Sequence, residues 1–297
     1  MKKKHPILYI LVLVLILIPS ILATEFGSQK LLNLFYPYNT NEQIPVNSIV
    51  YLTVSMISAF ILIGIYRKFI DKKDFFSMGF SIKDRMFDFF LGFSLGIFLL
   101  FIGFFILIVS GNTEVTSIEF KPEWLLGYTV FFILVSLHEE VLVRGYLLNS
   151  LMSVSNKYFA LLLSSLIFSA LHLMNPGIST VSFINIVLAG LLLGSSYIHS
   201  KNLWFPLAFH FSWNFFQGPI LGFEVSGHDI NSFISQNISN NDLITGGIFG
   251  FEGSVITTVL LALSIVAVNW FFEKKEALKQ KISIGFRNNE LTIENLD

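Results

Sequence analysis

Long apolar stretches, separated by short polar connections, recur along the whole chain. A helix that crosses the hydrocarbon core of a bilayer needs about 20 mostly apolar residues. The pattern therefore predicts an all-α, polytopic membrane bundle of about eight transmembrane helices, forming a single domain over residues 1–297. The predicted segments are 7–23, 47–66, 87–110, 125–150, 158–174, 180–198, 204–221 and 253–272, of which the fifth and seventh are short and carry polar residues.

Composition supports this class of protein. The chain is 54% hydrophobic and only 13% charged, and it contains 33 phenylalanines, which is incompatible with the surface of a soluble protein. Its net charge of −1 argues against nucleic acid as a partner. The absence of cysteine excludes disulfides, thiolate metal sites and a cysteine nucleophile.

The distribution of Lys and Arg predicts the orientation. With the basic start "MKKK" inside, eight crossings place nearly all Lys and Arg of the connections on the same side, and only Lys30 and Lys121 fall outside. The polar loop 222–247 holds acidic but no basic residues, as expected of an external loop. We therefore expect both termini in the cytoplasm, with 273–297 as a short cytoplasmic tail.

The first apolar segment admits a second interpretation. "MKKKHP" followed by an apolar run and "SILATEF" resembles a secretory signal peptide with its cleavage region. Its apolar run is longer than the roughly 7–15 residues usual for such peptides. The sequence favours a retained membrane anchor.

The stretch "LVSLHEEVLVRGYLL", residues 134–148, places charged side chains inside the fourth predicted segment. Each costs roughly 2.5–3.5 kcal/mol at the centre of a spanning helix. Residues four apart share a helix face, so Glu140 and Arg144 can pair and reduce this cost. Glu139 is turned by about 100° from Glu140 and lacks that partner. It is therefore the candidate functional carboxylate.

Two other segments carry polar residues with four-residue spacing. Phe168 precedes His172 in the fifth segment, and His210 precedes Asn214 in the seventh. A single His on an apolar helix is usually a packing residue, but two, together with an unpaired Glu, predict a pocket shared by three helices. The predicted boundaries put His172 near the external end and His210 near the cytoplasmic end of their helices, so these helices must be tilted or offset.

These residue types suit two hydrolytic mechanisms. In the first, Glu139 acts as general base on a water molecule while His210 and Asn214 donate hydrogen bonds to the oxyanion. In the second, His172, His210 and Glu139 bind a zinc ion that activates the water. A pocket that binds a peptide without catalysis is the alternative from another class of function.

The motifs EExxxR, FxxxH and HxxxN, in this order on successive helices, resemble the CPBP (ABI) family of CAAX prenyl endopeptidases and bacteriocin-processing intramembrane proteases. They stand here at Glu139–Arg144, at Phe168 with His172, and at His210 with Asn214, within a core of about 125–218. The resemblance implies an integral membrane endopeptidase of eight helices.

The resemblance also implies a role for each motif residue. Glu139 would activate the water, and His172 would position the water or the substrate carbonyl. His210 and Asn214 would form the oxyanion site. Glu140, Arg144 and Phe168 would support these catalytic groups.

The resemblance implies a membrane-associated peptide or protein as substrate and the lipid bilayer as surroundings. Many members are labelled metalloendopeptidases, but we expect a metal-free mechanism, with zinc as the alternative. The compact chain and its basic start indicate a prokaryotic plasma membrane, with a role in bacteriocin immunity or in the processing of peptides or surface proteins. A non-catalytic immunity or scaffold protein that uses the same pocket is the alternative function.

Other polar residues receive structural interpretations. We expect His138 to face a neighbouring helix or water, and His228 to be solvated in its loop. Glu252 precedes the last segment, where a helix dipole favours an acidic residue. Gly190 and Gly194 predict a close contact between two helices.

Overall fold

The computed structural model describes residues 9–11, 13–37 and 46–294 of this chain. The described part consists mainly of helices, with only two short strands, which confirms the predicted all-α membrane fold. Six of its helices are long and apolar enough to cross a membrane: Tyr9–Phe35, Val46–Asp71, Met86–Val109, Pro122–Met152, Thr180–Ser200 and Val255–Leu278. The predicted count of eight is not confirmed, because the fifth and seventh segments form shorter helices.

The elements follow one another along the chain with few long connections. The α-helices are α2 (Ile18–Phe35), α3 (Val46–Tyr66), α4 (Met86–Val109), α5 (Pro122–Glu140), α6 (Asn149–Met152), α7 (Lys157–Leu171), α8 (Thr180–Ser200), α9 (Trp204–Phe215), α10 (Asp242–Thr245) and α11 (Val255–Glu294). The π-helices are η1 (Leu13–Leu17), η2 (Arg67–Asp71), η4 (Val141–Leu148) and η5 (Phe216–Ile220), and the 3₁₀ turns are η3 (Phe76–Met78), η6 (Gly247–Phe249) and η7 (Phe251–Gly253). The strands are β1 (Thr113–Ile118) and β2 (Ile234–Ile238).

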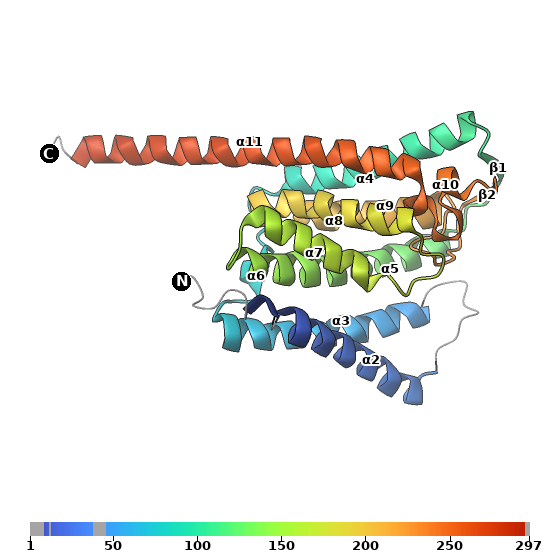
Figure 1. Cartoon of the computed structure of the whole chain (residues 1–297), viewed down its shortest axis with the longest axis horizontal. Coiled ribbons are helices and arrows are strands. Elements are labelled where there is room, and N and C mark those ends of the chain that lie inside the picture. Colours follow the sequence, from blue (N-terminus) through green and yellow to red (C-terminus); the bar gives the residue numbers. More distant parts are fainter. Residues whose placement is uncertain (1–8, 12, 38–45, 295–297) are drawn as a thin grey trace.

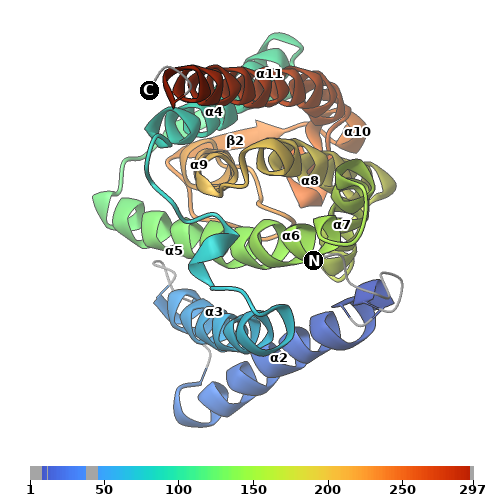
Figure 2. The ribbon, with the colours of Figure 1, turned by 90° about the vertical axis from the view of Figure 1, so that its left-hand side faces the viewer.

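The helices form a bundle with α8 and α9 enclosed in it. Helices α2 and α3 lie on one side, α4 and α11 lie on the opposite side, and α5 and α7 lie between (Figures 1 and 2). Of the apolar window of α8, 61% is buried, more than in any other described spanning helix. Buried polar residues lie on these inner helices, such as Asn185 and His210, and also on surrounding helices, such as Glu140 of α5.

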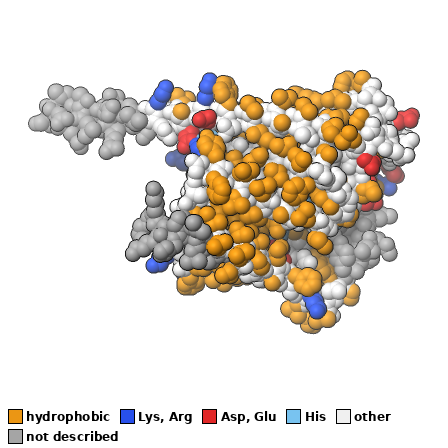
Figure 3. Space-filling view, viewed as in Figure 1, with side chains coloured by type: hydrophobic (Ala, Val, Ile, Leu, Met, Phe, Trp, Pro, Cys, Tyr) orange, Lys and Arg blue, Asp and Glu red, His pale blue; other side chains and the backbone are white. Residues whose placement is uncertain are grey.

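The outer surface matches a membrane environment. Hydrophobic side chains form a broad band across the middle of the visible face, and charged side chains gather toward its two ends (Figure 3). Large apolar side chains in this surface include Phe105, Leu263 and Val266, which are 65%, 66% and 70% exposed. Exposure of such large apolar side chains is unfavourable in water but favourable in contact with lipid hydrocarbon.

Helices α7 and α8 approach closely at the predicted small residues. A Cβ atom added to Gly190 would lie 2.8 Å from the Cβ of Ser165, and Gly194 lies against Leu161. Packing against Ser165 therefore requires glycine at position 190.

Helix α8 begins with a capping box in which Ser179 and Ser182 satisfy each other's backbone N–H groups.

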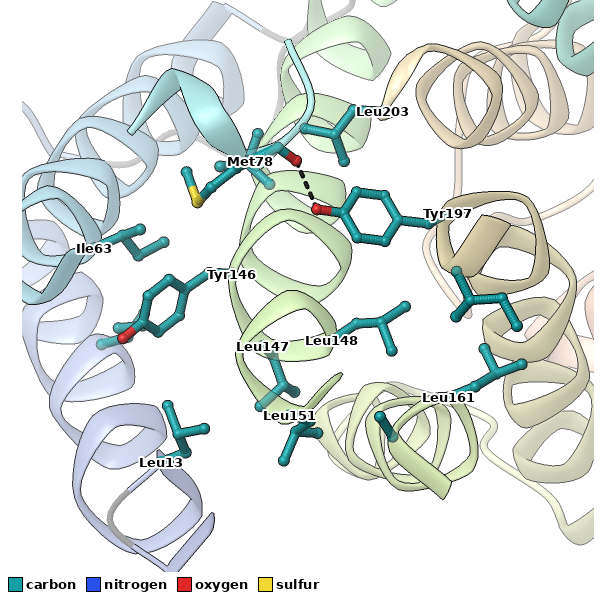
Figure 4. Packing of buried hydrophobic residues seen from close by; sticks show 14 of the residues in the cluster. Leu13, Ile63, Met78, Tyr146, Leu147, Leu148, Leu151, Leu161, Tyr197 and Leu203 are labelled. Atoms are coloured by element: carbon teal, nitrogen blue, oxygen red, sulfur yellow. Dashed lines mark hydrogen bonds between the residues drawn. The ribbon is translucent and has the colours of Figure 1, made fainter. Parts of the chain in front are cut away.

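One buried cluster joins the N-terminal helices to the rest of the bundle. Tyr146 points from η4 toward the helices that carry Ile63 and Leu13 (Figure 4). On the other side of the cluster, the hydroxyl of Tyr197 donates to the backbone oxygen of Met78 over 2.7 Å (Figure 4). The turn η3 and helix α8 are therefore tied together beside η4.

Two expectations about the ends of elements are corrected. The first segment was expected to end at residue 23, but its helix continues to Phe35. The last segment was expected to end at residue 272, but α11 continues to Glu294, because the Glu, Lys, Ala, Leu and Gln residues that follow are good helix formers. The cytoplasmic position of the tail 273–297 stays a prediction. The basic residues Lys2, Lys3 and Lys4, on which the orientation depends, lie outside the described residues.

The loop 222–247 contains a strand that the apolar pattern did not predict. Strand β2 pairs antiparallel with β1, with Thr113 opposite Ile238 and Ile118 opposite Ile234. The two strands lie at one end of the bundle, near α10 (Figure 1). This arrangement holds the loop over that end of the inner helices.

Candidate active site

The two adjacent glutamates lie where the helical geometry changes. Helix α5 ends at Glu140, and the chain continues without a break as the π-helix η4. π-helical turns occur frequently at functional sites. Glu140 is fully buried, whereas the side chain of Glu139 is 29% exposed. The neighbouring carboxylates therefore have different environments and can have different roles.

Glu140 is the centre of a buried hydrogen-bonded network. Its Oε1 accepts from Nη1 of Arg144 over 2.6 Å, as predicted from the four-residue spacing, and also from Nδ1 of His210 over 2.8 Å. The guanidinium carbon of Arg144 lies 4.4 Å from the ring centroid of Phe168. Arg144 thus compensates the buried carboxylate, and the carboxylate fixes the ring of His210.

Glu139 faces both histidines. Its Oε2 lies 4.0 Å from Nε2 of His172 and 3.8 Å from Nε2 of His210. This oxygen is buried and has no hydrogen-bond partner within the described part of the chain. An unpaired buried carboxylate oxygen is costly, so it indicates a position at which a bound molecule donates a hydrogen bond.

The second ring nitrogens determine what each histidine can do. Nδ1 of His172 lies 2.8 Å from the carbonyl oxygen of Phe168, which can only accept, so Nδ1 carries the proton. Nε2 of a neutral His172 is then an acceptor directed at Glu139. The Phe168 ring packs edge-on against both imidazoles, with centroids 4.9 Å from His172 and 6.5 Å from His210.

The lengths of the helices explain how residues from different predicted depths meet. Helix α7 is only 15 residues long, and His172 directly follows its last residue. Its end therefore reaches only the level of Glu139, which lies near the middle of the span Pro122–Met152. His210 lies in the middle of α9. The helices that carry His172 and His210 are therefore offset as expected, because α7 is short.

A cavity of about 410 Å³ surrounds these groups. All four candidate catalytic residues, Glu139, His172, His210 and Asn214, line it together with Phe168. The structure thus brings the predicted residues of three helices into one pocket. Its size suits a few side chains of a bound peptide.

Several polar residues of the cavity wall were not predicted from the sequence. Oε1 of Glu25 in α2 lies 2.9 Å from Nε2 of His138, and both residues line the cavity. Glu25 is an acidic residue inside an apolar segment, a signal that could have found it. His228 is exposed as expected, but it also lines the cavity, as does Glu252. Their separation along the chain concealed this proximity.

The donor atoms as placed do not fit a zinc ion. Zinc binds nitrogen and oxygen at about 2.0–2.2 Å, so two ligands of one tetrahedral ion lie about 3.3–3.6 Å apart. The distances from Glu139 to His172 and His210 are longer, 4.0 and 3.8 Å. Within the described residues, no group of three or more His, Cys, Asp or Glu side chains is arranged to hold a metal ion.

The fold and this pocket define a polytopic α-helical membrane protein with a buried glutamate–histidine site. Residues 121–216 match the family model described as "Type II CAAX prenyl endopeptidase Rce1-like". The matched region contains every residue of the three motifs, and the match confirms the family resemblance found in the sequence. No curated protein was found that matches the chain.

Proposed function

We propose that the protein is an intramembrane endopeptidase that hydrolyses a peptide bond with water activated by Glu139. The observation that carries the proposal is the unpaired Oε2 of Glu139, buried between the Nε2 atoms of His172 and His210. The family match over residues 121–216 supports a CAAX-type protease as the reaction class.

In the first step, Glu139 and His172 hold the attacking water. Both offer acceptors, and one water can donate an O–H to each of two acceptors about 4–4.5 Å apart with normal hydrogen-bond lengths. The distance of 4.0 Å between Oε2 and Nε2 fits this arrangement. Glu139 takes a proton as the water oxygen bonds to the carbonyl carbon.

In the second step, His210 and Asn214 stabilise the oxyanion. The Glu140 carboxylate at Nδ1 stabilises a doubly protonated His210, whose Nε2–H can then donate to the oxyanion. The amide of Asn214, on the same helix and in the same cavity, supplies a second donor. Glu139 then returns its proton to the leaving amine as the C–N bond breaks. Glu140 and Arg144, which do not line the cavity, and Phe168, which does, position these groups.

The proposed mechanism uses no metal. Zinc remains the testable alternative, with Glu139, His172 and His210 as its ligands. Elemental analysis of the purified protein before and after chelator treatment decides between them. Stoichiometric zinc that is lost together with activity would contradict the metal-free mechanism.

The proposed substrate is a membrane-associated peptide or protein in a prokaryotic plasma membrane, with both termini of the protease in the cytoplasm. The cavity opens among helices that carry apolar side chains, which favours a substrate already in the bilayer. Bacteriocin immunity and the processing of peptides or surface proteins fit such a substrate. A prenylated substrate is not required by any residue of the site.

The test compares membrane peptides from cells that express the wild-type protein or Glu139→Gln. Peptides cleaved by the wild type then serve as substrates for the purified protein in liposomes. We expect Glu139→Gln to lower the cleavage rate by about 10²–10⁴-fold, the usual contribution of a general base. The matched control is Glu123→Gln, because Glu123 is an exposed glutamate in the first turn of α5.

Two results would contradict the proposal. Equal cleavage rates for wild type and Glu139→Gln would remove Glu139 as the base. A cellular phenotype that survives Glu139→Gln and His172→Ala, with both variants present in the membrane, would favour the non-catalytic scaffold.

A further inference from the structure

Glu252 forms part of the wall of the catalytic cavity. It lies in η7, directly before α11, and lines the same cavity as Glu139. Its Oε2 accepts hydrogen bonds from the backbone N–H and the hydroxyl of Ser226, each over 2.8 Å. Its backbone oxygen accepts from Nδ2 of Asn185 over 2.7 Å. The carboxylate is therefore held in one place from both the loop and α8.

The loop that holds Glu252 is itself fixed. The carbonyl oxygen of Ser226 accepts from Nδ2 of Asn175 over 3.1 Å, and the backbone N–H of Gly227 donates to the oxygen of Phe249 over 3.1 Å. Gly227 has a φ of +84°, and a side chain there would meet the backbone of Pro176. Three segments distant in sequence are thus bonded together around the carboxylate.

The charges of the cavity wall are unbalanced. Glu25, Glu139 and Glu252 line the cavity, whereas no Lys or Arg lines it within the described part of the chain. His138 pairs with Glu25, and His172 and His210 face Glu139, although both also lie near enough to Glu252 to act on its carboxylate electrostatically. No described Lys, Arg or His makes an ion pair with Glu252. A partly buried carboxylate held by hydroxyl and amide donors is stabilised further by a cation.

We propose that Glu252 forms a subsite for a positively charged group of the substrate, either a Lys or Arg side chain or a free amino terminus. This subsite fixes the position of the peptide relative to Glu139 and thereby selects the bond that is cut. The inference rests on the proposed function, because it takes the cavity as the binding site of a peptide.

The test measures binding to full-length protein in liposomes, in a Glu139→Gln background so that no cleavage occurs. The probes are fluorescent, end-blocked peptides of one apolar sequence, in which a single Lys is moved along the chain, each with a matched norleucine version. A second set has a free instead of an acetylated amino terminus. For one position of the charge we expect Kd to be lower by about tenfold or more, as for a charge-assisted hydrogen bond.

Glu252→Gln must abolish this preference, since it keeps the shape and an acceptor for Ser226 but removes the charge. Glu224→Gln is the matched control: it removes a carboxylate from the same loop, but Glu224 does not line the cavity. Ser226→Ala removes one hydrogen bond to Glu252 and keeps the charge. Both Glu224→Gln and Ser226→Ala must retain the preference for the cationic peptide.

Each outcome decides the inference. Equal binding of charged and neutral peptides at every position overturns it, as does a charge preference that persists in Glu252→Gln. If Ser226→Ala loses the preference for the cationic peptide as completely as Glu252→Gln does, the preference depends on the order of the loop rather than on the charge of Glu252. This result would also overturn the inference. Failure of the proposed catalysis gives a different result. In that case, protein with an intact Glu139 does not cleave the peptides, but the preference for the cationic peptide remains.

Discussion

The buried network around Glu140 allows a quantitative prediction for Arg144→Met. The side chains of Arg144 and Glu140 are 1% and 0% exposed, and their charged atoms are 2.6 Å apart. Methionine keeps most of the volume and removes the charge, which leaves Glu140 with His210 as its remaining described hydrogen-bond partner. The substitution therefore isolates the role of the guanidinium.

The expected loss of stability is large. Removal of one partner from a buried ion pair costs about 3–5 kcal/mol, because the remaining charge is uncompensated. The contact of Arg144 with the Phe168 ring adds up to about 2 kcal/mol in a desolvated site. Glu140→Gln should cost a similar 3–5 kcal/mol, since it leaves the guanidinium buried instead.

The double variant distinguishes a coupled pair from two independent residues. Independent losses would add to about 6–12 kcal/mol, the Phe168 contact included, whereas a coupled pair predicts that Glu140→Gln with Arg144→Met costs no more than Arg144→Met alone, about 3–7 kcal/mol. The assay is reversible unfolding of the purified full-length protein in mixed micelles. Additive losses, or a loss below about 1 kcal/mol for Arg144→Met, would refute the reasoning.

An exposed ion pair supplies the control. Oε2 of Glu119 lies 3.1 Å from Nζ of Lys121, and these side chains are 65% and 34% exposed. Glu119→Gln should therefore change the free energy of unfolding by less than about 1 kcal/mol. A loss as large as that of Glu140→Gln would show that burial is not the cause.

Two further predictions concern packing and pH. Gly190→Ala should lower stability by about 1–3 kcal/mol, because its Cβ would crowd Ser165, and Ser165→Gly should restore most of the loss; a neutral effect in unfolding assays would contradict the close contact. Burial raises the pKa of Glu252 above its ordinary 4.5, so the preference for a cationic peptide should be full above that raised pKa and decline as pH falls through it. Because His172 and His210 also act on this carboxylate, the measurement is the difference between wild type and Glu252→Gln in Kd against pH; identical pH profiles would contradict the role of Glu252.

The sequence by itself determined the class of fold and the local pairs of the site. Helix geometry fixes which residues four apart share a face, so the bond between Glu140 and Arg144 and the contact between Phe168 and His172 followed from spacing alone. The cost of charge in a membrane also identified Glu139 as a candidate. These inferences needed no knowledge of how the helices pack.

Tertiary structure decided the contacts between helices. It gave His210 a hydrogen bond to Glu140 as well as a position opposite Glu139, and it made the chain π-helical after Glu140. It also brought Glu25 and Glu252, from opposite ends of the chain, into one cavity wall. Spacing along a helix cannot predict such contacts, because they depend on the lengths, rotations and offsets of helices, which the packing of the whole bundle sets.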